Sequence, residues 1–270
     1  YAMERFWERL SASKYRNCFI LKGGMLISAM VGIDSRATMD IDTTLRNYPL
    51  NCESAEQIVR QIADVEIDDK ISFVIKKTEE IMEDSEYQGV RLSLDAYLDK
   101  TRIPLKIDIS TGDVITPCEI SFSYQLMFEN RTIPLLAYPP ETVLAEKLET
   151  ILSRGEANTR LRDFYDVYIL QREDFVVTPD ALRYALLATC RKRGHEDLLH
   201  TYASILDRVR QSDTMRTQWM KYQSDFDYAA GITWDTVLDT VETLCMKTLD
   251  DHAFGDELPQ EESQFEMHLL

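Results

Sequence analysis

The stretch CFILKGGMLISAMV, residues 18–31, decides the fold together with MDIDTTL at residues 39–45. The apolar start of the first stretch predicts a short strand, the pair Gly23-Gly24 breaks it, and Met25–Val31 predicts a helix. The second stretch alternates apolar and acidic side chains, which is the two-residue period of a strand. A strand, a glycine turn, a helix and a second strand are therefore the local plan.

The remainder of residues 1–138 predicts a mixed sheet with helices. Apolar residues at helical spacing indicate helices over Ala2–Ala12 and Ser54–Val65. Three further β-rich segments are Ile71–Lys76, Gly89–Leu98 and Ile103–Ile109. Strands that alternate with helices in this way are most economically arranged as helices packed on one mixed sheet.

The pattern changes at Tyr138-Pro139-Pro140, because two prolines cannot continue a strand ladder and suit the start of a helix. We therefore expect an α+β fold, with a sheet domain over residues 1–138, an all-helical domain over 139–249 and an acidic, flexible tail over 250–270. The predicted helices of the second half are Pro140–Ser153, Arg160–Gln171, Pro179–Arg193, Glu196–Arg210, Thr214–Tyr222 and Trp234–Leu249.

Composition narrows the functional classes. The apolar runs are far shorter than the roughly 20 residues that a membrane span needs, and the first residues do not resemble a signal peptide, so we expect a soluble, cytoplasmic protein without a membrane partner. The five cysteines are scattered and the four histidines all lie in the C-terminal part, which disfavours zinc and a His/Cys nucleophile. The net charge of −17 weakens a nucleic-acid hypothesis. It does not exclude one, because seven of the acidic residues lie within 250–270.

Asp40 and Asp42 are the first candidates for chemistry. Two residues apart on a strand, they project from the same face. Mg²⁺ is commonly bound by one or two carboxylates together with water and substrate phosphates. Asp108, between two isoleucines on another predicted strand, is costly to bury without a cation or a partner. The alternatives are solvent-facing strand charges and, for Asp108, an ion pair with Lys106.

The glycine pair and the helical half offer further candidates. Gly23-Gly24 precedes a helix, where bare backbone can approach a phosphate, although an ordinary tight turn is the alternative. Lys147 is either a surface cation or a phosphate contact. Asp163 and Asp166 lie one helical turn apart, with Arg160 or Arg162 nearby, and a salt-bridged helix surface is the alternative there.

Taken together, six segments resemble the AbiEii/AbiGii nucleotidyltransferase-like toxin family. Their order and spacing match from about residue 17 to residue 172, while the remaining helices match only in type. Where the family often has Gly-Ser, this chain has Gly23-Gly24, so only the backbone role is carried over. The segments are Leu21-Lys22-Gly23-Gly24, Arg36-Ala-Thr-Met-Asp40-Ile-Asp42, Leu105-Lys106-Ile107-Asp108-Ile109, Ala137-Tyr138-Pro139, Glu141-Thr-Val-Leu-Ala-Glu146-Lys147 and Asn158-Thr-Arg160-Leu-Arg162-Asp163-Phe-Tyr-Asp166.

The resemblance implies a polymerase-β-like nucleotidyltransferase domain followed by the helical domain. By it, Asp40, Asp42 and Asp108 would bind Mg²⁺, or Mn²⁺ in its place. Lys147 would contact the phosphates of the nucleotide, and Asp166 would be a further active-site acid. Arg36 would hold a phosphate through its guanidinium, with Arg160 as a weaker candidate for the same task.

The resemblance also implies a reaction and partners. An acceptor hydroxyl would attack the α-phosphorus of a nucleoside triphosphate (NTP), and the acceptor would be RNA, at the 3′ end of a tRNA. The protein would act as the toxin of a toxin–antitoxin or abortive-infection system with a cognate antitoxin. Arg191-Lys192-Arg193 could contact an RNA backbone, but a basic helix end favoured by the macrodipole is the alternative that we prefer.

Two other functional classes remain open at this point. One is a catalytically idle nucleotide-binding module with the same fold, which the complete set of acids disfavours. The other is a metal-dependent phosphohydrolase, which would commonly use histidine ligands, whereas all four histidines lie far from the predicted acids.

Overall fold

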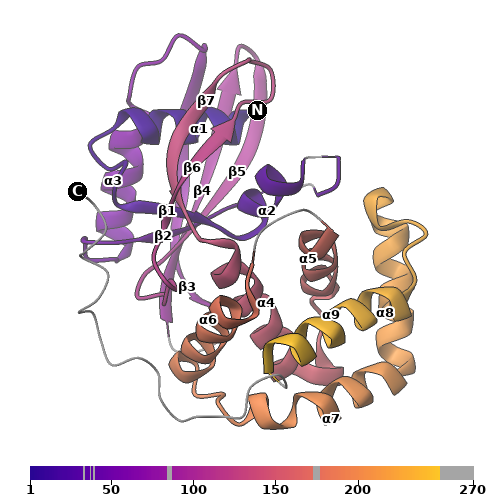
Figure 1. The fold of residues 1–270 in the computed structure, drawn as a ribbon. Helices are drawn as coiled ribbons and strands as arrows, with labels where there is room; N and C mark the ends of the chain where they lie inside the picture. Colours follow the sequence, from indigo (N-terminus) through magenta and orange to yellow (C-terminus); the bar gives the residue numbers. More distant parts are fainter. Residues whose placement is uncertain (33, 37, 39, 84–86, 173–176, 250–270) are drawn as a thin grey trace.

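The structure, a computed structural model of the 270-residue chain, describes residues 1–249 apart from 33, 37, 39, 84–86 and 173–176. Seven strands form one mixed sheet in the order β3-β4-β5-β2-β1-β7-β6 (Figure 1). The pairs β2–β5 and β1–β7 are parallel, and the other neighbours are antiparallel. The strands are β1 (Phe19–Lys22), β2 (Asp40–Leu45), β3 (Ile71–Glu83), β4 (Tyr87–Leu98), β5 (Thr101–Ser110), β6 (Ile120–Gln125) and β7 (Thr132–Ala137).

The helices of the first half cover the sheet. Helix α1 (Ala2–Ala12) buries Phe6, Trp7 and Leu10 and packs against α3 (Cys52–Ala63). A capping box begins α3, because Asn51 Oδ1 accepts from the Ser54 amide while Ser54 Oγ accepts from the Asn51 amide. Helix α2 (Gly23–Val31) contacts β1, β2 and the helical half, and it lies between the two in Figure 1.

The chain becomes helical where the two prolines predict it. Strand β7 ends at Ala137, and α4 begins at Pro140 with that proline in its first turn. Figure 1 shows the helices that follow gathered on the side of the molecule away from α1 and α3. They are α4 (Pro140–Arg154), α5 (Leu161–Arg172), α6 (Pro179–Lys192), α7 (Leu198–Gln211), α8 (Asp213–Asp225) and α9 (Trp234–Leu249), with short 3₁₀ turns at Gly155–Ala157 and Asp227–Ala229.

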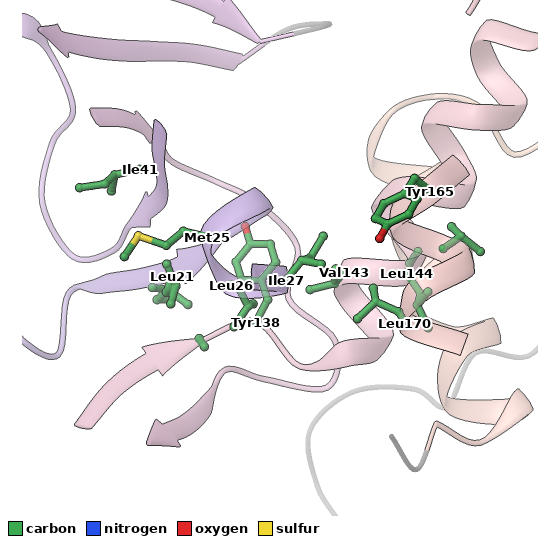
Figure 2. Close-up of a cluster of buried hydrophobic side chains, with 14 of the residues drawn as sticks. Leu21, Met25, Leu26, Ile27, Ile41, Tyr138, Val143, Leu144, Tyr165 and Leu170 are labelled. Carbon is green, nitrogen blue, oxygen red and sulfur yellow. The ribbon is translucent and has the colours of Figure 1, made fainter. Parts of the chain in front are cut away.

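The buried side chains form one cluster that continues from the sheet into the helical half. Figure 2 follows it from Leu21 and Met25 past Tyr138 to Val143 and Leu170. The α+β class with a mixed sheet and helical second half is confirmed, while the division into two domains at residues 138 and 139 stays a prediction. The predicted acidic tail, residues 250–270, lies outside the described residues. In the part of the chain that is described, none of the helices combines the length and hydrophobicity needed to cross a bilayer.

Strands β6 and β7 were not predicted, although both complete the sheet. Residues 120–125 alternate aliphatic or aromatic side chains with polar ones, so the two-residue period of a strand is present in β6. In β7 this signal is weakened by Pro134, which lacks a backbone N–H. Strand β7 lies between β1 and β6, and this position brings the start of α4 beside the end of β1.

The turn between β1 and α2 requires glycine at its first position. Gly23 has φ of +62°, and a Cβ built there would lie 2.3 Å from Asp42 Oδ2. A side chain at residue 23 would therefore face both backbone strain and a clash with a carboxylate that the site needs.

We expect Gly23→Ala to lower the free energy of unfolding by about 3 kcal/mol, because backbone strain and displacement of Asp42 add together. Gly194 is a matched control, since its φ is +67° and a Cβ there would have open space around it. Gly194→Ala is expected to cost only the backbone term of about 1–2 kcal/mol. Urea denaturation of both variants measures the difference, and equal losses would contradict the account of the turn.

Candidate active site

A cavity of about 1070 Å³ lies between the sheet and the helical half. This is slightly above the roughly 300–1,000 Å³ that small-molecule sites occupy, so the cavity has room for a nucleotide. Eight of the nine predicted site residues line it: Gly23, Gly24, Arg36, Asp40, Asp42, Asp108, Lys147 and Arg160. The ninth, Asp166, is fully buried beneath the lining.

A row of four charged residues crosses the floor of this cavity. The register places Arg91 of β4 opposite Asp108 of β5, Asp108 opposite Asp42 of β2, and Asp42 opposite Lys22 of β1. Directly opposed residues share one face of a sheet, and all four line the cavity. Asp40 lies two residues before Asp42 and also lines it. The two predicted acidic segments therefore meet on neighbouring strands, flanked by a cation on each side.

Asp108 is held by Arg91. The guanidinium donates from Nε to Asp108 Oδ1 over 2.7 Å and from Nη2 to Oδ2 over 2.6 Å. This bidentate bond raises the pKa of Arg91 above its ordinary value. The proposed alternative partner, Lys106, is exposed and lies opposite Asp40 instead, so that alternative is wrong.

The carboxylates of the cavity suit Mg²⁺ that is shared with a substrate. Asp40 and Asp42 present two carboxylates from one strand face to a cavity, which fits an ion that takes its remaining ligands from water and substrate phosphates. Asp108 is adjacent, but both its oxygens accept from Arg91. Within the described part of the chain, no three Asp, Glu, His or Cys side chains gather closely enough to hold an ion alone. The residues present thus fit a metal bound together with substrate, and the ligand role of Asp108 stays a prediction.

The second glycine of the turn is explained by its neighbours. The Gly24 amide lies 3.4 Å from Asp42 Oδ2, to which it donates. A Cβ at residue 24 would lie 2.9 Å from Thr38 Oγ1 and 3.0 Å from Arg36 Nη2. Side chains that line the cavity therefore already occupy the space that a serine would need. The structure gives a steric reason for Gly-Gly in this chain, with the hydroxyl of Thr38 next to that position.

Asp166 joins two cations from distant parts of the chain. Arg36 donates from Nε to Asp166 Oδ1 over 2.7 Å, and Lys147 Nζ lies 3.0 Å from Asp166 Oδ2. Burial raises the pKa of Asp166, but Lys147 and Arg36 outweigh it, so the pKa is lowered overall. The predicted active-site acid is thus placed behind the lining, where it positions Arg36 and Lys147.

The cluster around Asp166 carries more positive than negative charge. Lys147 Nζ also lies 2.6 Å from Asp163 Oδ1, and Arg160 Nε lies 3.0 Å from Asp163 Oδ2. Burial lowers the pKa of Lys147, but Asp163 and Asp166 raise it more, so the lysine remains charged. Three cations face two carboxylates, and all three line the cavity. The arrangement favours an anionic ligand. The helix-surface alternative is wrong for both aspartates, since both are buried.

Sequence reasoning missed several residues of the lining. No role was predicted for Lys22, although it lies in one of the family motifs. Its Nζ donates to Ser110 Oγ over 2.7 Å and to Asp113 Oδ2 over 3.1 Å. Its position at the end of an apolar strand could have indicated a role in the site. Arg91 gave no such indication, because only the strand register places it beside Asp108.

The basic segment at the end of α6 fits each of its two interpretations, an RNA contact and a basic helix end, only in part. Lys192 and Arg193 line the cavity, whereas Arg191 is exposed and pairs with Glu196 at 2.9 Å. Arg193 also donates to Glu149, a buried acid of α4. Two of the three cations therefore line the cavity, and one of these, Arg193, also pairs with a buried acid.

We expect Asp166→Asn to lower the free energy of unfolding at pH 7 by about 3–5 kcal/mol, because Arg36 and Lys147 would lose a buried counter-charge. The depressed pKa of Asp166 means that its stabilisation is present above the unfolded-state value of about 4 and is lost as pH falls through the lower folded value. The gap between wild type and variant should therefore narrow on acidification.

Urea denaturation at pH 7 and at stepwise lower pH measures both effects. Asp239→Asn is the matched control, because Asp239 pairs with Arg210 on the surface, where an ion pair contributes about 0–1 kcal/mol. A loss for Asp166→Asn no greater than the control would show that Asp166 does not hold the cluster together.

Comparison with known proteins identifies the family of this chain. No curated protein matches the sequence. Two solved structures from Helicobacter pylori are similar at 14% identity. One is a provisionally assigned nucleotidyltransferase (TM-score 0.49, covering 93% of this chain and 95% of that one), and the other is JHP933 (TM-score 0.48, 92% and 91%). The model of the family described as nucleotidyl transferase AbiEii toxin, type IV TA system, matches residues 5–240. The resemblance predicted from the motifs is confirmed, and the chain belongs to the AbiEii nucleotidyltransferase toxin family.

Proposed function

We propose that this protein transfers a nucleotide from an NTP to a hydroxyl of RNA, at the 3′ end of a tRNA, in a reaction that depends on Mg²⁺ or Mn²⁺. One observation carries the proposal: the paired carboxylates Asp40 and Asp42 and the cationic cluster of Arg36, Lys147 and Arg160 line the same cavity. Carboxylates that suit a divalent ion and cations that suit phosphates are the two requirements of an NTP site.

The residues divide the work between them. Asp40 and Asp42 would hold the ion, which offsets charge on the triphosphate. Arg36, Lys147 and Arg160 bind and orient the phosphates, and Asp166 keeps the first two in place. The acceptor oxygen forms a bond to the α-phosphorus while the bond from that phosphorus to the β-bridging oxygen breaks. Pyrophosphate leaves. The proton of the hydroxyl passes to one of the two carboxylates on the cavity floor, Asp42 or Asp108.

The lining supports a polyanionic second substrate. Among the described residues, nine Lys or Arg and seven Asp or Glu line the cavity, although the whole chain has a net charge of −17. Lys192, Arg193 and Lys221 extend the positive charge beyond the cluster around Asp166. A local excess of cations attracts a phosphate backbone even on an acidic protein.

Transfer is tested with purified protein, Mg²⁺, each α-labelled NTP and total bacterial RNA. We expect label on RNA from the wild type and at least a hundredfold less from Asp42→Ala, which should remain folded because Asp42 lies at the cavity surface. Asp68→Ala, at an exposed position outside the lining, is the control and should retain full transfer.

Three outcomes would contradict the proposal. Release of free phosphate or nucleoside monophosphate without labelled RNA would indicate a hydrolase, and tight NTP binding without either product would indicate an idle module. Full transfer by Asp42→Ala would remove the carboxylate pair from the mechanism.

Family membership implies a cognate antitoxin, so toxicity is a second readout. Expression of the wild type in a bacterium that lacks the antitoxin gene should arrest growth, with RNA 3′ ends extended, because transfer would block tRNA charging. Asp40→Ala should relieve the arrest at equal protein level. Equal growth of the two strains, with both proteins soluble by immunoblot, would count against a toxic transferase.

A further inference from the structure

One face of helix α8 forms a wall of the cavity, and of this wall the proposed chemistry uses only Lys221. Gln218, Lys221, Tyr222 and Asp225 line the cavity at the i, i+3, i+4 and i+7 spacing of one helix face, and Phe226 follows directly. The wall combines three polar side chains, Gln218, Lys221 and Asp225, with the rings of Tyr222 and Phe226. Apart from Lys221, it offers stacking surfaces and hydrogen-bonding groups.

The aromatic rings of this wall are held from behind. Trp219 stacks on Tyr222 with ring centroids 5.3 Å apart and planes at 26°, and Tyr228 stacks on Phe226 with the same values. The hydroxyls of Tyr222 and Tyr228 lie 3.1 Å apart. Rings fixed in this way lose little conformational freedom when a flat ligand stacks on them.

Arg162 adds a planar cation to the same wall. Its guanidinium carbon lies 5.4 Å from the centre of the Phe226 ring, and Arg162 also lines the cavity. Aromatic rings and guanidinium planes are the groups on which nucleobases stack without regard to sequence. The wall is therefore chemically suited to a purine or pyrimidine ring.

Gln218 supplies a group that can discriminate between bases. Its Oε1 is buried and accepts no hydrogen bond from any residue that the structure describes, although the side chain lines the cavity. A buried carbonyl oxygen without a donor is unfavourable unless a ligand supplies one. A side-chain amide carries donors and an acceptor side by side, which matches the edge of a base.

The wall adjoins the phosphate cluster. Helix α5 carries Asp163 and Asp166 in that cluster, and Tyr165 between them packs against Tyr222 and Tyr228 with ring centroids 6.2 and 4.8 Å apart. A ligand whose phosphates lie on Arg36 and Lys147 thus has the aromatic wall beside it in the same cavity.

We propose that Gln218, Tyr222 and Phe226, together with Arg162, form a subsite for the base of the incoming nucleotide, and that Gln218 determines which NTP is preferred. The inference rests on the proposed function, because it assigns the base end of the same substrate. Phe226 stacks on the base, and Tyr222, which is only 8% exposed, supports Phe226 with ring centroids 4.7 Å apart. Arg162 covers the edge of the stack, and the Gln218 amide hydrogen-bonds the base edge.

Equilibrium dialysis with Mg²⁺ tests the subsite on the full chain. The probes are ATP, GTP, CTP, UTP and inorganic tripolyphosphate, which has the phosphates without a base. We expect the wild type to bind its preferred NTP at least about tenfold more tightly than both tripolyphosphate and its least preferred NTP.

Two conservative variants separate stacking from discrimination. Phe226→Leu should bring the affinity for every NTP about fivefold or more closer to that for tripolyphosphate. Gln218→Leu should reduce the preference among NTPs to less than about threefold. Met220→Leu is the control on the same helix, since Met220 is 61% exposed and outside the described lining. Circular dichroism and the melting temperature of each variant report on folding.

The outcomes distinguish this inference from the proposed function. If the wild type binds neither NTP nor tripolyphosphate, the NTP site itself is wrong. If NTPs bind no more tightly than tripolyphosphate, or if Gln218→Leu keeps the wild-type preference, the base subsite is wrong while the phosphate site stands. If the variants leave NTP binding unchanged and raise only the KM for RNA, the wall holds a base of the acceptor instead, which overturns the assignment.

Discussion

The ion pairs of Asp166 connect the two halves of the molecule at the point where the site forms. Arg36 lies in the segment that leads into β2, Lys147 lies on α4, and Asp166 on α5 holds both. Tyr165 adds a hydrogen bond of 2.5 Å from its hydroxyl to the Ser35 carbonyl, so α5 also holds the backbone beside Arg36. A buried carboxylate between two cations is stable only with both partners present. This requirement fixes the cationic side of the cavity relative to the sheet.

The acidic side of the cavity follows from a second constraint, the register of the sheet. Lys22, Asp42, Asp108 and Arg91 belong to four strands and become neighbours only because β1, β2, β5 and β4 pair as they do. A shift of one residue in any pairing would turn one of these side chains to the opposite face. The glycine turn after β1 protects the arrangement, since any Cβ at residue 23 would reach the carboxylate of Asp42.

The parts of this site that depend on local sequence could be predicted. The two-residue period places Asp40 and Asp42 on one face, and the glycine pair ends β1 before α2. The isolated acid in the apolar strand β5 marks Asp108. Each of these signals needs only a few neighbouring residues. The helix boundaries of the second half follow likewise from periodicity and from the prolines that begin α4 and α6.

The parts of the site that depend on long-range pairing could not be predicted from the sequence. Asp166 has the sequence context of a solvent-exposed helical acid, and only the packing of α5 on α2 and α4 buries it. Arg91 becomes the partner of Asp108 through strand register, and the face of α8 becomes a cavity wall through the way the helices of the second half pack. Strand β7 was missed because its proline suggests a loop, while its pairing with β1 needs residues more than a hundred positions away.

The central claim is that one cavity binds a divalent ion on Asp40 and Asp42 and a triphosphate on Arg36, Lys147 and Arg160. A crystal structure with Mn²⁺ and a non-hydrolysable NTP analogue, recorded at a wavelength where manganese scatters anomalously, tests it most directly. We expect an anomalous peak between the Asp40 and Asp42 carboxylates, with the triphosphate extending to the three cations. A triphosphate bound elsewhere, or one bound in the cavity with manganese absent from both carboxylates, would contradict the account.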